Sequence, residues 1–439
     1  MQFGCLKSSM EARFLYTPRY DQDRIYLNLF RRHWSAYSRR HDMEIEEYQK
    51  KIVERFILCG DPKEGFALVQ CPDCGESYFV PFSCKTRICN SCGEKHILEW
   101  TDWLSHEVLL NVNHRHMVWT LPRELDECFK GRPWLMKQLL QITCSIADYL
   151  FSVDGKAGLV AVLQTYGDRI NFNPHVHMLM AECQIKDAFW SKGLSLKEGC
   201  EEGLVLPVPR VNFKHLNVSW RNRVLDLLVN AERLTTDQAE EFKTKYPHGF
   251  VVYQTEKQTN DNEEEARSIA AYLMKPPVHE RKIERYDEET DNVLIRFKYG
   301  VDGCRKNIYK FESMSVDEFI SRTIQHILPF HLQRVRYYGF YSNKHRGKYH
   351  RKQQKDSKPR KAYNMGWRKL LWRVFHVEPL KCLNCGAEMK ITGIFTGVRA
   401  REILKDYSAF KFYIKGRWRE DRRRMPGVPP YGFERRRAA

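Results

Sequence analysis

Two histidines separated by a single residue, His175 and His177, lie in the segment NPHVHMLM that begins at Asn173. Side chains on a β-strand alternate between its two faces, so these imidazoles point the same way while Val176 and Met178 point toward a core. Two imidazoles on one rigid face are suitable ligands for a divalent metal ion. Packed or solvated histidines also occur at this spacing, so the segment alone leaves both interpretations open.

A third ligand is available on the segment that precedes the histidines. Gln164 lies in GLVAVLQTYG, residues 158–167, which we expect to form a strand antiparallel to the histidine strand. The connection from Tyr166 to Asn173 would then bring Gln164 level with the histidines. Its amide oxygen suits Mg²⁺ or Mn²⁺. An ordinary polar strand residue is the alternative.

A tyrosine later in the chain, Tyr272, lies in NEEEARSIAAYLMKPP, residues 262–277. The acidic residues after Asn262 and the closing prolines predict a helix. A tyrosine hydroxyl beside a metal-bound phosphate can attack phosphorus and hold the product as an ester. Lys275, one turn further on, would steady the phosphate or the phenolate. A core aromatic residue is the alternative for Tyr272.

Cysteines are clustered unevenly, since five of the 14 fall between Cys71 and Cys92. Cys71 and Cys74 form one CxxC knuckle, and Cys89 and Cys92 form a second. Two knuckles complete a tetrahedral four-thiolate zinc site, which folds a module rather than catalyses. We therefore predict one structural Zn²⁺ on these four residues. The possible substitutes are Cys84 and His96.

Two basic residues beside this cluster and a later CxxC pair indicate a function less specifically. Lys85 and Arg87 beside the cluster are candidates for contact with nucleic-acid phosphates, or they form a solvated face. Cys382 and Cys385 form a single CxxC that is followed by neither cysteine nor histidine, and so resemble half a zinc site. Upstream histidines such as His376 are possible partners.

The hydrophobic periodicity supplies the elements that must position these groups. Two helices are expected in residues 25–57 and another from His96 to Leu110. Strand, helix, strand, strand, helix, strand and helix then follow, which predicts an α+β domain around a central antiparallel sheet. The expected strands are His116–Leu121, Gly158–Gly167, Pro174–Ala181 and Gly249–Gln254; the expected helices are 124–152, 217–233 and Asn262–Lys275. Short strands and a helix, Val316–Ile327, are expected in residues 281–340.

This periodicity suggests five divisions of the chain. They are a helical region (1–58), a zinc-ribbon module (59–105), the sheet domain (106–280), its C-terminal extension (281–343) and a basic region with the last CxxC (344–439).

The length and net charge of the chain indicate which class of molecule it binds. The chain has 439 residues and a formal net charge of +18. It holds no apolar run of the roughly 18 residues needed to span a bilayer, and its start lacks the apolar core of a signal peptide. We expect a cytoplasmic protein without membrane contact. A basic chain of this kind usually binds nucleic acid, although the charge could serve solubility alone.

The segment YYGFY, Tyr337–Tyr341, combines aromatic rings with nearby cations. Such a combination can stack unpaired bases, whereas a buried strand is the alternative. The flanking cations that we expect to contact DNA are Arg336, Lys344 and Arg346. A longer basic stretch, Lys344–Asn364, has the composition of a linker or of an arm on nucleic acid.

Four blocks in this order resemble one known family: the cysteine module, HVHML, AAYLMKPPV and FHLQRVRYYGFYSNKHRGK. They are similar to transposases of the insertion sequence 91 type, which are HUH-superfamily rolling-circle enzymes, over roughly residues 25–400. The resemblance implies an HUH endonuclease domain that cleaves single-stranded DNA with a divalent metal. It implies that His175 and His177 are metal ligands, that Gln164 takes the third place, and that Tyr272 becomes joined to the 5′ phosphate.

The chain departs from the usual family pattern at one position. The family typically carries two tyrosines four residues apart, but the earlier position here is Ser268. The resemblance therefore implies a single-tyrosine variant, whose strand transfer would need a second protomer in a homodimer, a free 3′ hydroxyl or another tyrosine. A bacterial, nucleoid-associated protein is expected. Two other functions remain open: a plasmid replication initiator or relaxase with the same chemistry, and a non-catalytic zinc-dependent DNA-binding protein.

Overall fold

The computed structural model describes residues 12–14, 25–110, 112–192, 203–254, 274–299, 308–347, 366–375, 378–405, 410–414 and 417–420. Contacts within the chain define two compact units, each discontinuous in sequence. The first comprises Met1–Leu98, Val278–Ile324 and Met365–Ala439, and the second comprises Glu99–Pro277 and Gln325–Asn364. Segments that are far apart in the sequence therefore fold together in both units.

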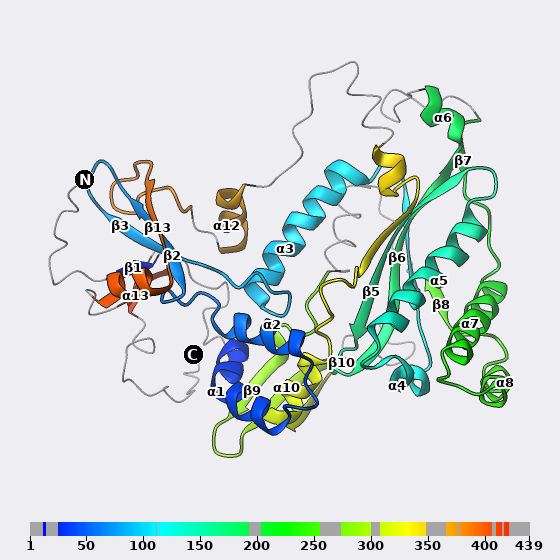
Figure 1. The fold of residues 1–439 in the computed structure, drawn as a ribbon. Helices are drawn as coiled ribbons and strands as arrows, with labels where there is room; N and C mark the ends of the chain where they lie inside the picture. Colours follow the sequence, from blue (N-terminus) through cyan, green and yellow to red (C-terminus); the bar gives the residue numbers. More distant parts are fainter. Residues whose placement is uncertain are drawn as a thin grey trace. The chain divides into compact units, whose positions relative to one another are not determined.

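The second unit is built on an antiparallel sheet in the order β12-β5-β6-β4-β8, with β7 paired to β6. Figure 1 shows its two long strands, β5 and β6, side by side. The strands are β4 (His114–Trp119), β5 (Lys156–Tyr166), β6 (Phe172–Ile185), β7 (Val205–Pro207), β8 (Val252–Gln254) and β12 (Val335–Gly339). The predicted α+β class with a central antiparallel sheet is confirmed.

One face of this sheet carries the main hydrophobic core, and Figure 1 shows α5 lying along the sheet. Alternate residues of β5 and β6, such as Leu159 and Met178, pack there with Leu139 of α5 and Trp220 of α7. The helices of this unit are α4 (Asp126–Phe129), α5 (Pro133–Phe151), α6 (Asp187–Lys192), α7 (Phe213–Asn230) and α8 (Thr236–Lys245). Among the described residues no helix, α5 included, has the length and apolarity needed to cross a membrane.

Several predicted boundaries differ from the observed ones for local reasons. The single helix expected over residues 124–152 is wrong, because a left-handed Gly131 (φ 69°) and the following Pro133 separate α4 from α5. The helix expected from His96 begins earlier, as α3 (Asn90–Trp103), and continues as a π-helix over Leu104–Val108. The helix expected over Asn262–Lys275 lies outside the described residues except for its last two positions.

The first unit contains a helical layer beside a three-stranded sheet. The two helices predicted in residues 25–57 are confirmed as α1 (Ile25–Arg40) and α2 (Glu47–Ile57). In α1, the ring of Tyr26 is tilted against Phe56 of α2, whereas the ring of Phe30 meets Phe56 edge-on. Tyr26 also packs edge-on against Phe319. The other elements here are β9 (Ile283–Asp287), β10 (Asn292–Tyr299), β11 (Ile308–Ser315) and α10 (Val316–Ile324).

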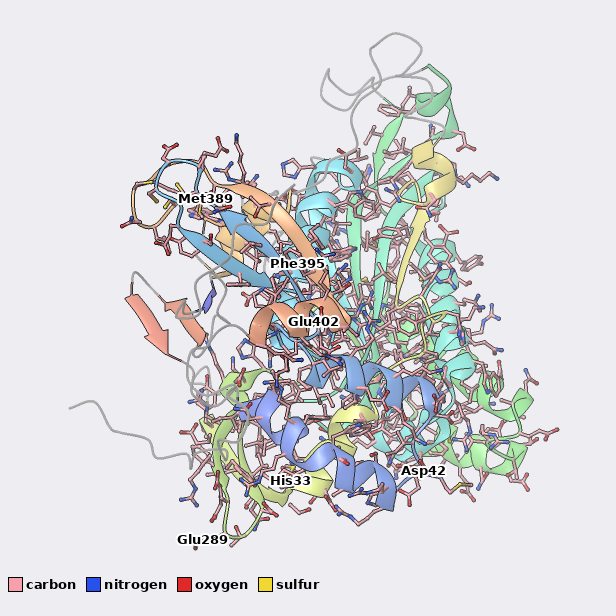
Figure 2. The ribbon with its side chains drawn as sticks, turned by 60° about the vertical axis from the view of Figure 1, so that its left-hand side comes forward. His33, Asp42, Glu289, Met389, Phe395 and Glu402 are labelled. Atoms are coloured by element: carbon pink, nitrogen blue, oxygen red, sulfur yellow. The ribbon has the colours of Figure 1, made fainter. Side chains whose placement is uncertain are left out.

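A six-stranded sheet in the first unit contains strands from both ends of the sequence. Its strand order is β13-β2-β3-β1-β14-β15, and Figure 2 labels Phe395 on β13 and Glu402 on α13. The elements are β1 (Ala12–Phe14), β2 (Gly65–Gln70), β3 (Ser77–Pro81), α12 (Trp367–Phe375), β13 (Lys390–Thr396), α13 (Gly397–Lys405), β14 (Phe410–Ile414) and β15 (Arg417–Glu420). Residues from the start and the end of the chain thus share one sheet.

The YYGFY segment forms the edge strand β12 and the turn that follows it. Phe340 and Tyr341 are buried, whereas Tyr337 and Tyr338 are half-buried. The Tyr341 hydroxyl accepts a hydrogen bond from Leu110 N at 3.2 Å and lies 2.7 Å from His114 Nε2. The aromatic rings of this segment therefore pack largely within the second unit, as in the buried-strand alternative.

Gly339 is the position in this turn that tolerates no side chain. Its φ is 58°, and a Cβ there would lie 1.5 Å from the carbonyl oxygen of Ala157. We expect Gly339→Ala to reduce the free energy of unfolding by roughly 3 kcal/mol or more, because left-handed strain and steric overlap act together. Gly131→Ala is the matched control: φ there is 69° with open space around it, so about 1 kcal/mol should be lost. Equal losses in urea unfolding would contradict the steric argument.

His114 should make the stability of the second unit depend on pH. Burial lowers its pKa from 6.5 to about 4. Between these two values the unfolded chain binds a proton that the folded chain does not, so stability falls as pH drops from 6.5 toward 4, by roughly 3 kcal/mol in full. We expect the free energy of unfolding of His114→Gln, measured with urea at pH 7.5 and at pH 5, to fall less between these two pH values than that of the wild type. The difference should correspond to the one proton that His114 binds on unfolding. An unchanged slope would show that His114 does not titrate in this way.

Candidate functional site

The two histidines of β6 lie together on the face of the sheet opposite the helical core. Val176 and Met178 are completely buried in that core, so strand alternation places His175 and His177 on the other face. Their Nε2 atoms lie 3.0 Å apart. Two nitrogens that bind one ion at about 2.1 Å and at a right angle are separated by about 3 Å. The pair therefore has a spacing that suits two ligands of a single metal.

Gln164 stands directly opposite His175 in the β5–β6 ladder. Directly opposed residues of an antiparallel pair share a face of the sheet, so the amide belongs to the histidine face. The Gln164 side chain is 5% exposed. The ladder changes register just after it, between Gln164 and Tyr166. The structure thus brings together the three residues that the sequence suggested as ligands of a divalent ion.

A third histidine, which the sequence analysis did not single out, extends the pair. His116 of β4 places Nε2 3.0 Å from Nδ1 of His177, and the two rings are stacked with centroids 5.2 Å apart. A hydrogen bond to the second ring nitrogen fixes the orientation and tautomer of a ligating histidine. The signal was present in the segment HRHMVW, where His114 and His116 repeat the spacing of the β6 pair.

Burial keeps these imidazoles neutral. It lowers the pKa of His177 to about 2 and that of His116 to about 4, and it also lowers the pKa of His175. A neutral imidazole has a free lone pair, which is the form that binds metal ions. The donor set of two neutral imidazoles and one amide oxygen therefore fits a divalent cation at neutral pH.

Lys275 is attached to the end of β5 through its backbone. The Tyr166 hydroxyl donates a hydrogen bond to the carbonyl oxygen of Lys275 at 2.5 Å, two residues beyond Gln164 on the same strand. Tyr272 and Ser268 lie outside the described residues. The chain three residues after Tyr272 is therefore held at the strand end nearest to Gln164.

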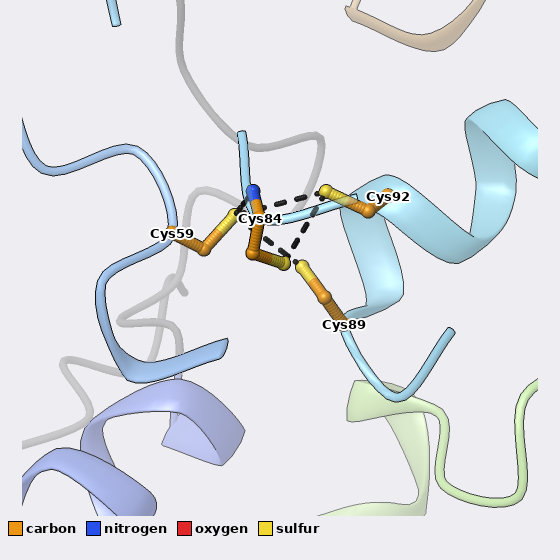
Figure 3. Close-up of side chains that lie close together, drawn as sticks. All are labelled: Cys59, Cys84, Cys89 and Cys92. Atoms are coloured by element: carbon orange, nitrogen blue, oxygen red, sulfur yellow. Dashed lines mark hydrogen bonds between the residues drawn. The ribbon is translucent and has the colours of Figure 1, made fainter. Parts of the chain in front are cut away.

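Four cysteine thiols of the first unit converge in a buried cluster, which Figure 3 shows in close-up. Cys59 lies 3.8 Å from Cys92 and 3.6 Å from Cys89 (Sγ to Sγ), and Cys84 lies 3.6 Å from Cys92. All four side chains are buried. Their arrangement can hold one metal ion, and we refer to them as the buried cluster.

A second group of four thiols lies at the surface of the same unit. Cys71 and Cys74 meet Cys382 and Cys385, with all four sulfur atoms within 4.8 Å of one another. Cys74 and Cys385 are exposed, while Cys71 and Cys382 are buried. We refer to this group as the surface cluster.

The structure corrects the predicted ligand set of a single zinc site. Cys71 and Cys74 do not share a cluster with Cys89 and Cys92. The first knuckle lies at the turn between β2 and β3, whereas the second follows the far end of β3. Five residues of strand at about 3.3 Å each separate the two knuckles by roughly 16 Å. A single ion cannot bridge that distance.

The fourth member of the buried cluster was missed, because Cys59 is an isolated cysteine far from any CxxC. Cys84, expected only as a substitute, belongs to this cluster, whereas His96 does not. His96 Nε2 instead lies 3.5 Å from Nη2 of Arg87. The single signal for Cys59 was its position directly before Gly60 at the end of a predicted helix.

The basic residues proposed to contact DNA fall into two groups. Lys85, Arg87 and Lys344 have exposed side chains. Arg346 is half-buried, with its guanidinium 5.2 Å from the Trp103 ring centroid and 5.1 Å from that of Tyr337. Arg336 is half-buried on β12 as well. Arg346 and Arg336 therefore pack within the second unit in the structure.

Comparison with known proteins gives a consistent match. The family described as "Transposase zinc-binding domain" matches residues 29–121, and the family described as "Putative transposase" matches residues 158–349. The transposase for the insertion sequence element IS801 of Pseudomonas savastanoi is 25% identical over 406 residues, which cover 87% of this chain and 92% of that protein. A protein of Sinorhizobium fredii described as a "putative transposase" is 24% identical over 332 residues, 73% of this chain and 80% of that protein. No solved structure matches the chain.

The family matches cover the features built above from the residues. The zinc-binding match contains the whole buried cluster, and the transposase match contains Gln164 and both histidines of β6. Zinc is therefore the metal expected at the thiolates. Together with two relatives that align over most of their lengths, these matches show that the chain belongs to the transposases of the insertion sequence 91 type.

Proposed function

We propose that this transposase cleaves and rejoins single-stranded DNA at the ends of its element through a covalent 5′-phosphotyrosine intermediate. The observation that carries the proposal is the convergence of His175 and His177, whose Nε2 atoms are 3.0 Å apart on one face of β6. Gln164, opposite His175, completes a donor set on two adjacent strands. Tyr272 is the proposed nucleophile.

The three donors would hold Mg²⁺ or Mn²⁺ and leave further coordination positions open for a phosphate. When bound, such an ion polarises the scissile phosphate and offsets the negative charge that develops during phosphoryl transfer. His116 acts as a positioning residue, because its bond to Nδ1 of His177 leaves Nε2 of that ring to face the ion. Burial of the imidazoles keeps these nitrogens unprotonated.

The connection at Lys275 supports the assignment of Tyr272. Three peptide units separate the two residues, so covalent geometry limits their Cα separation to roughly 11 Å. Lys275 is itself anchored by Tyr166 at the end of β5 that carries Gln164. The described residue that lies three positions after Tyr272 is therefore held on the strand that carries Gln164, which supports Tyr272 as the nucleophile of the proposal.

The proposed reaction balances without an external energy source. The Tyr272 oxygen forms a bond to phosphorus, and the bond from phosphorus to the 3′ oxygen of the preceding nucleotide breaks. The proton lost by the tyrosine ends on that 3′ oxygen, which becomes a free hydroxyl. Attack by a 3′ hydroxyl on the phosphotyrosine reverses these steps and reseals the strand. Lys275 would steady the phosphate or the phenolate.

Ser268 leaves one tyrosine where the family typically has two. Two nucleophiles of one active site therefore cannot alternate here. Strand transfer would use the free 3′ hydroxyl, a second protomer of a homodimer or another tyrosine. Of the five cations that the sequence suggested for DNA contact, Lys85, Arg87 and Lys344 have exposed side chains, so these three are the ones we propose to contact phosphates.

Tyr272→Phe should abolish the covalent adduct with a single-stranded oligonucleotide that carries an element end, because phenylalanine lacks the attacking oxygen. The measurement is a shift of the protein band on a denaturing gel with labelled DNA and Mn²⁺. Tyr149→Phe serves as the control, since Tyr149 is 83% exposed on α5 and should keep full adduct yield. An adduct that survives in Tyr272→Phe would refute the nucleophile assignment.

His175→Ala and His177→Ala should each lower Mn²⁺-dependent cleavage by roughly a hundredfold or more, since changes at residues that merely support ligands already cost about 10- to 100-fold. The same variants should bind Mn²⁺ more weakly in calorimetry, a readout that is independent of DNA. His215→Ala is the control, because His215 is exposed on α7. Unchanged Mn²⁺ affinity in both β6 variants would remove the metal site from the proposal.

A further inference from the structure

We propose that Cys71, Cys74, Cys382 and Cys385 bind a second structural zinc ion, which fastens the C-terminal segment of the chain onto its N-terminal hairpin. The family match for zinc binding ends at residue 121 and includes only the first two of these cysteines. The inference concerns folding of the first unit and does not depend on the reaction proposed for Tyr272.

The two halves of the surface cluster are built alike. Each is a CxxCG knuckle, in which the glycine N–H donates to the carbonyl oxygen of the first cysteine: Gly75 to Cys71 at 3.1 Å and Gly386 to Cys382 at 2.9 Å. Gly75 and Gly386 have φ values of 74° and 79°. Both turns thus adopt the left-handed glycine conformation that lets two thiols of one knuckle converge. The knuckle of Cys382 and Cys385, for which the sequence showed no partner, therefore has the same turn conformation as the knuckle of Cys71 and Cys74.

The sulfur separations match a shared tetrahedral ion. Cys71 lies 3.5 Å from Cys385, and Cys74 lies 3.5 Å from Cys382 (Sγ to Sγ). Ligands at about 2.3 Å from one zinc ion are about 3.8 Å apart, whereas the sulfurs of a disulfide are about 2.05 Å apart. The spacing is therefore that of four thiolates around zinc. Four thiolates close the coordination shell, so this ion would have a structural role.

The strands around the cluster hold the knuckles in register. β13 pairs antiparallel with β2, and β2 pairs antiparallel with β3, which forms the three-stranded frame of a zinc ribbon. Lys390 lies opposite Gln70, one residue before Cys71. The hydroxyl of Tyr78, a buried residue of β3, accepts a hydrogen bond from Leu383 N in the second knuckle at 3.2 Å. Cys74 and Cys382, which are 308 positions apart in the sequence, are thereby brought together.

Among the described residues, the apolar cluster behind this frame is small. Its buried members are Phe66, Phe79, Ala400 and Leu404, with Phe395 partly buried against them. Modules with so little core usually need a metal or another cross-link to fold. Zinc at the surface cluster would supply that cross-link between segments that have no covalent connection nearby.

The zinc content of the full-length protein tests the pairing. We expect two zinc ions per chain in the wild type, and one in Cys74→Ser, in Cys385→Ser and in the double variant. Equal loss in the single and double variants shows that both residues serve one ion, although 311 positions separate them in the sequence. Cys128→Ser, a change on α4 that belongs to neither cluster, should retain two ions. One ion in the wild type, or two in Cys385→Ser, would overturn the proposal.

Alkylation of the wild-type protein gives a test that does not rely on a variant folding. Cys74 and Cys385 are exposed, whereas all four residues of the buried cluster are buried. Mild chelation followed by iodoacetamide should therefore label the surface-cluster cysteines together and first, as read by peptide mass spectrometry. Labelling of Cys382 and Cys385 in the zinc-loaded protein at the rate of a free thiol would show that they hold no ion.

Discussion

The two-residue period of β6 is the constraint on which the candidate chemistry depends. Val176, Met178 and Met180 are fully buried against the helices, so they fix which face of the strand points inward. His175 and His177 then have a single available face, and a slip of one residue in pairing would bury both in an apolar core. The hydrophobic packing of the sheet is therefore what presents two imidazoles side by side.

Pairing with the neighbouring strands turns this pair into a site. β5 sets Gln164 opposite His175, and β4 brings His116 to the second nitrogen of His177. These contacts come from adjacent antiparallel strands, which are rigid supports for a metal site. No long loop is needed to assemble the donors. The geometry of the candidate site is thus a direct consequence of strand order in the second unit.

Local periodicity explains how much of this was visible in the sequence. The histidine face and the position of Gln164 followed from strand alternation and a short connection, which are properties of neighbouring residues. His116 was missed because its role arises from the pairing of β4 with β6, two strands separated by α4, α5 and β5. Such cross-strand partners depend on tertiary contacts, which a local pattern does not contain. The break between α4 and α5 was missed for a different reason, because Gly131 and Pro133 mark it locally and the helical pattern was extended across them.

The cysteines show the same limit at longer range. CxxC spacing identifies knuckles, but it does not say which knuckles share an ion. That choice follows from the length of β3, which separates Cys74 from Cys89, and from the pairing of β2 with β13, which brings Cys382 from the other end of the chain. Cys59 had no local signature of a ligand.

The two units offer different types of metal-binding atoms. Each cysteine cluster offers four thiolates, which saturate a tetrahedral ion and leave it no position for a substrate. The histidine face offers two imidazoles and one amide oxygen from described strands, so a hard divalent ion bound there retains positions for phosphate oxygens. All eight thiolates lie in the first unit, and the histidine face lies wholly in the second. β4, β5 and β6 pack on a core of their own in the second unit, and this core contains none of the eight cysteines. In our proposals, zinc on the thiolates stabilises the fold of the first unit, and the histidine face of the second unit holds the divalent ion that takes part in strand cleavage.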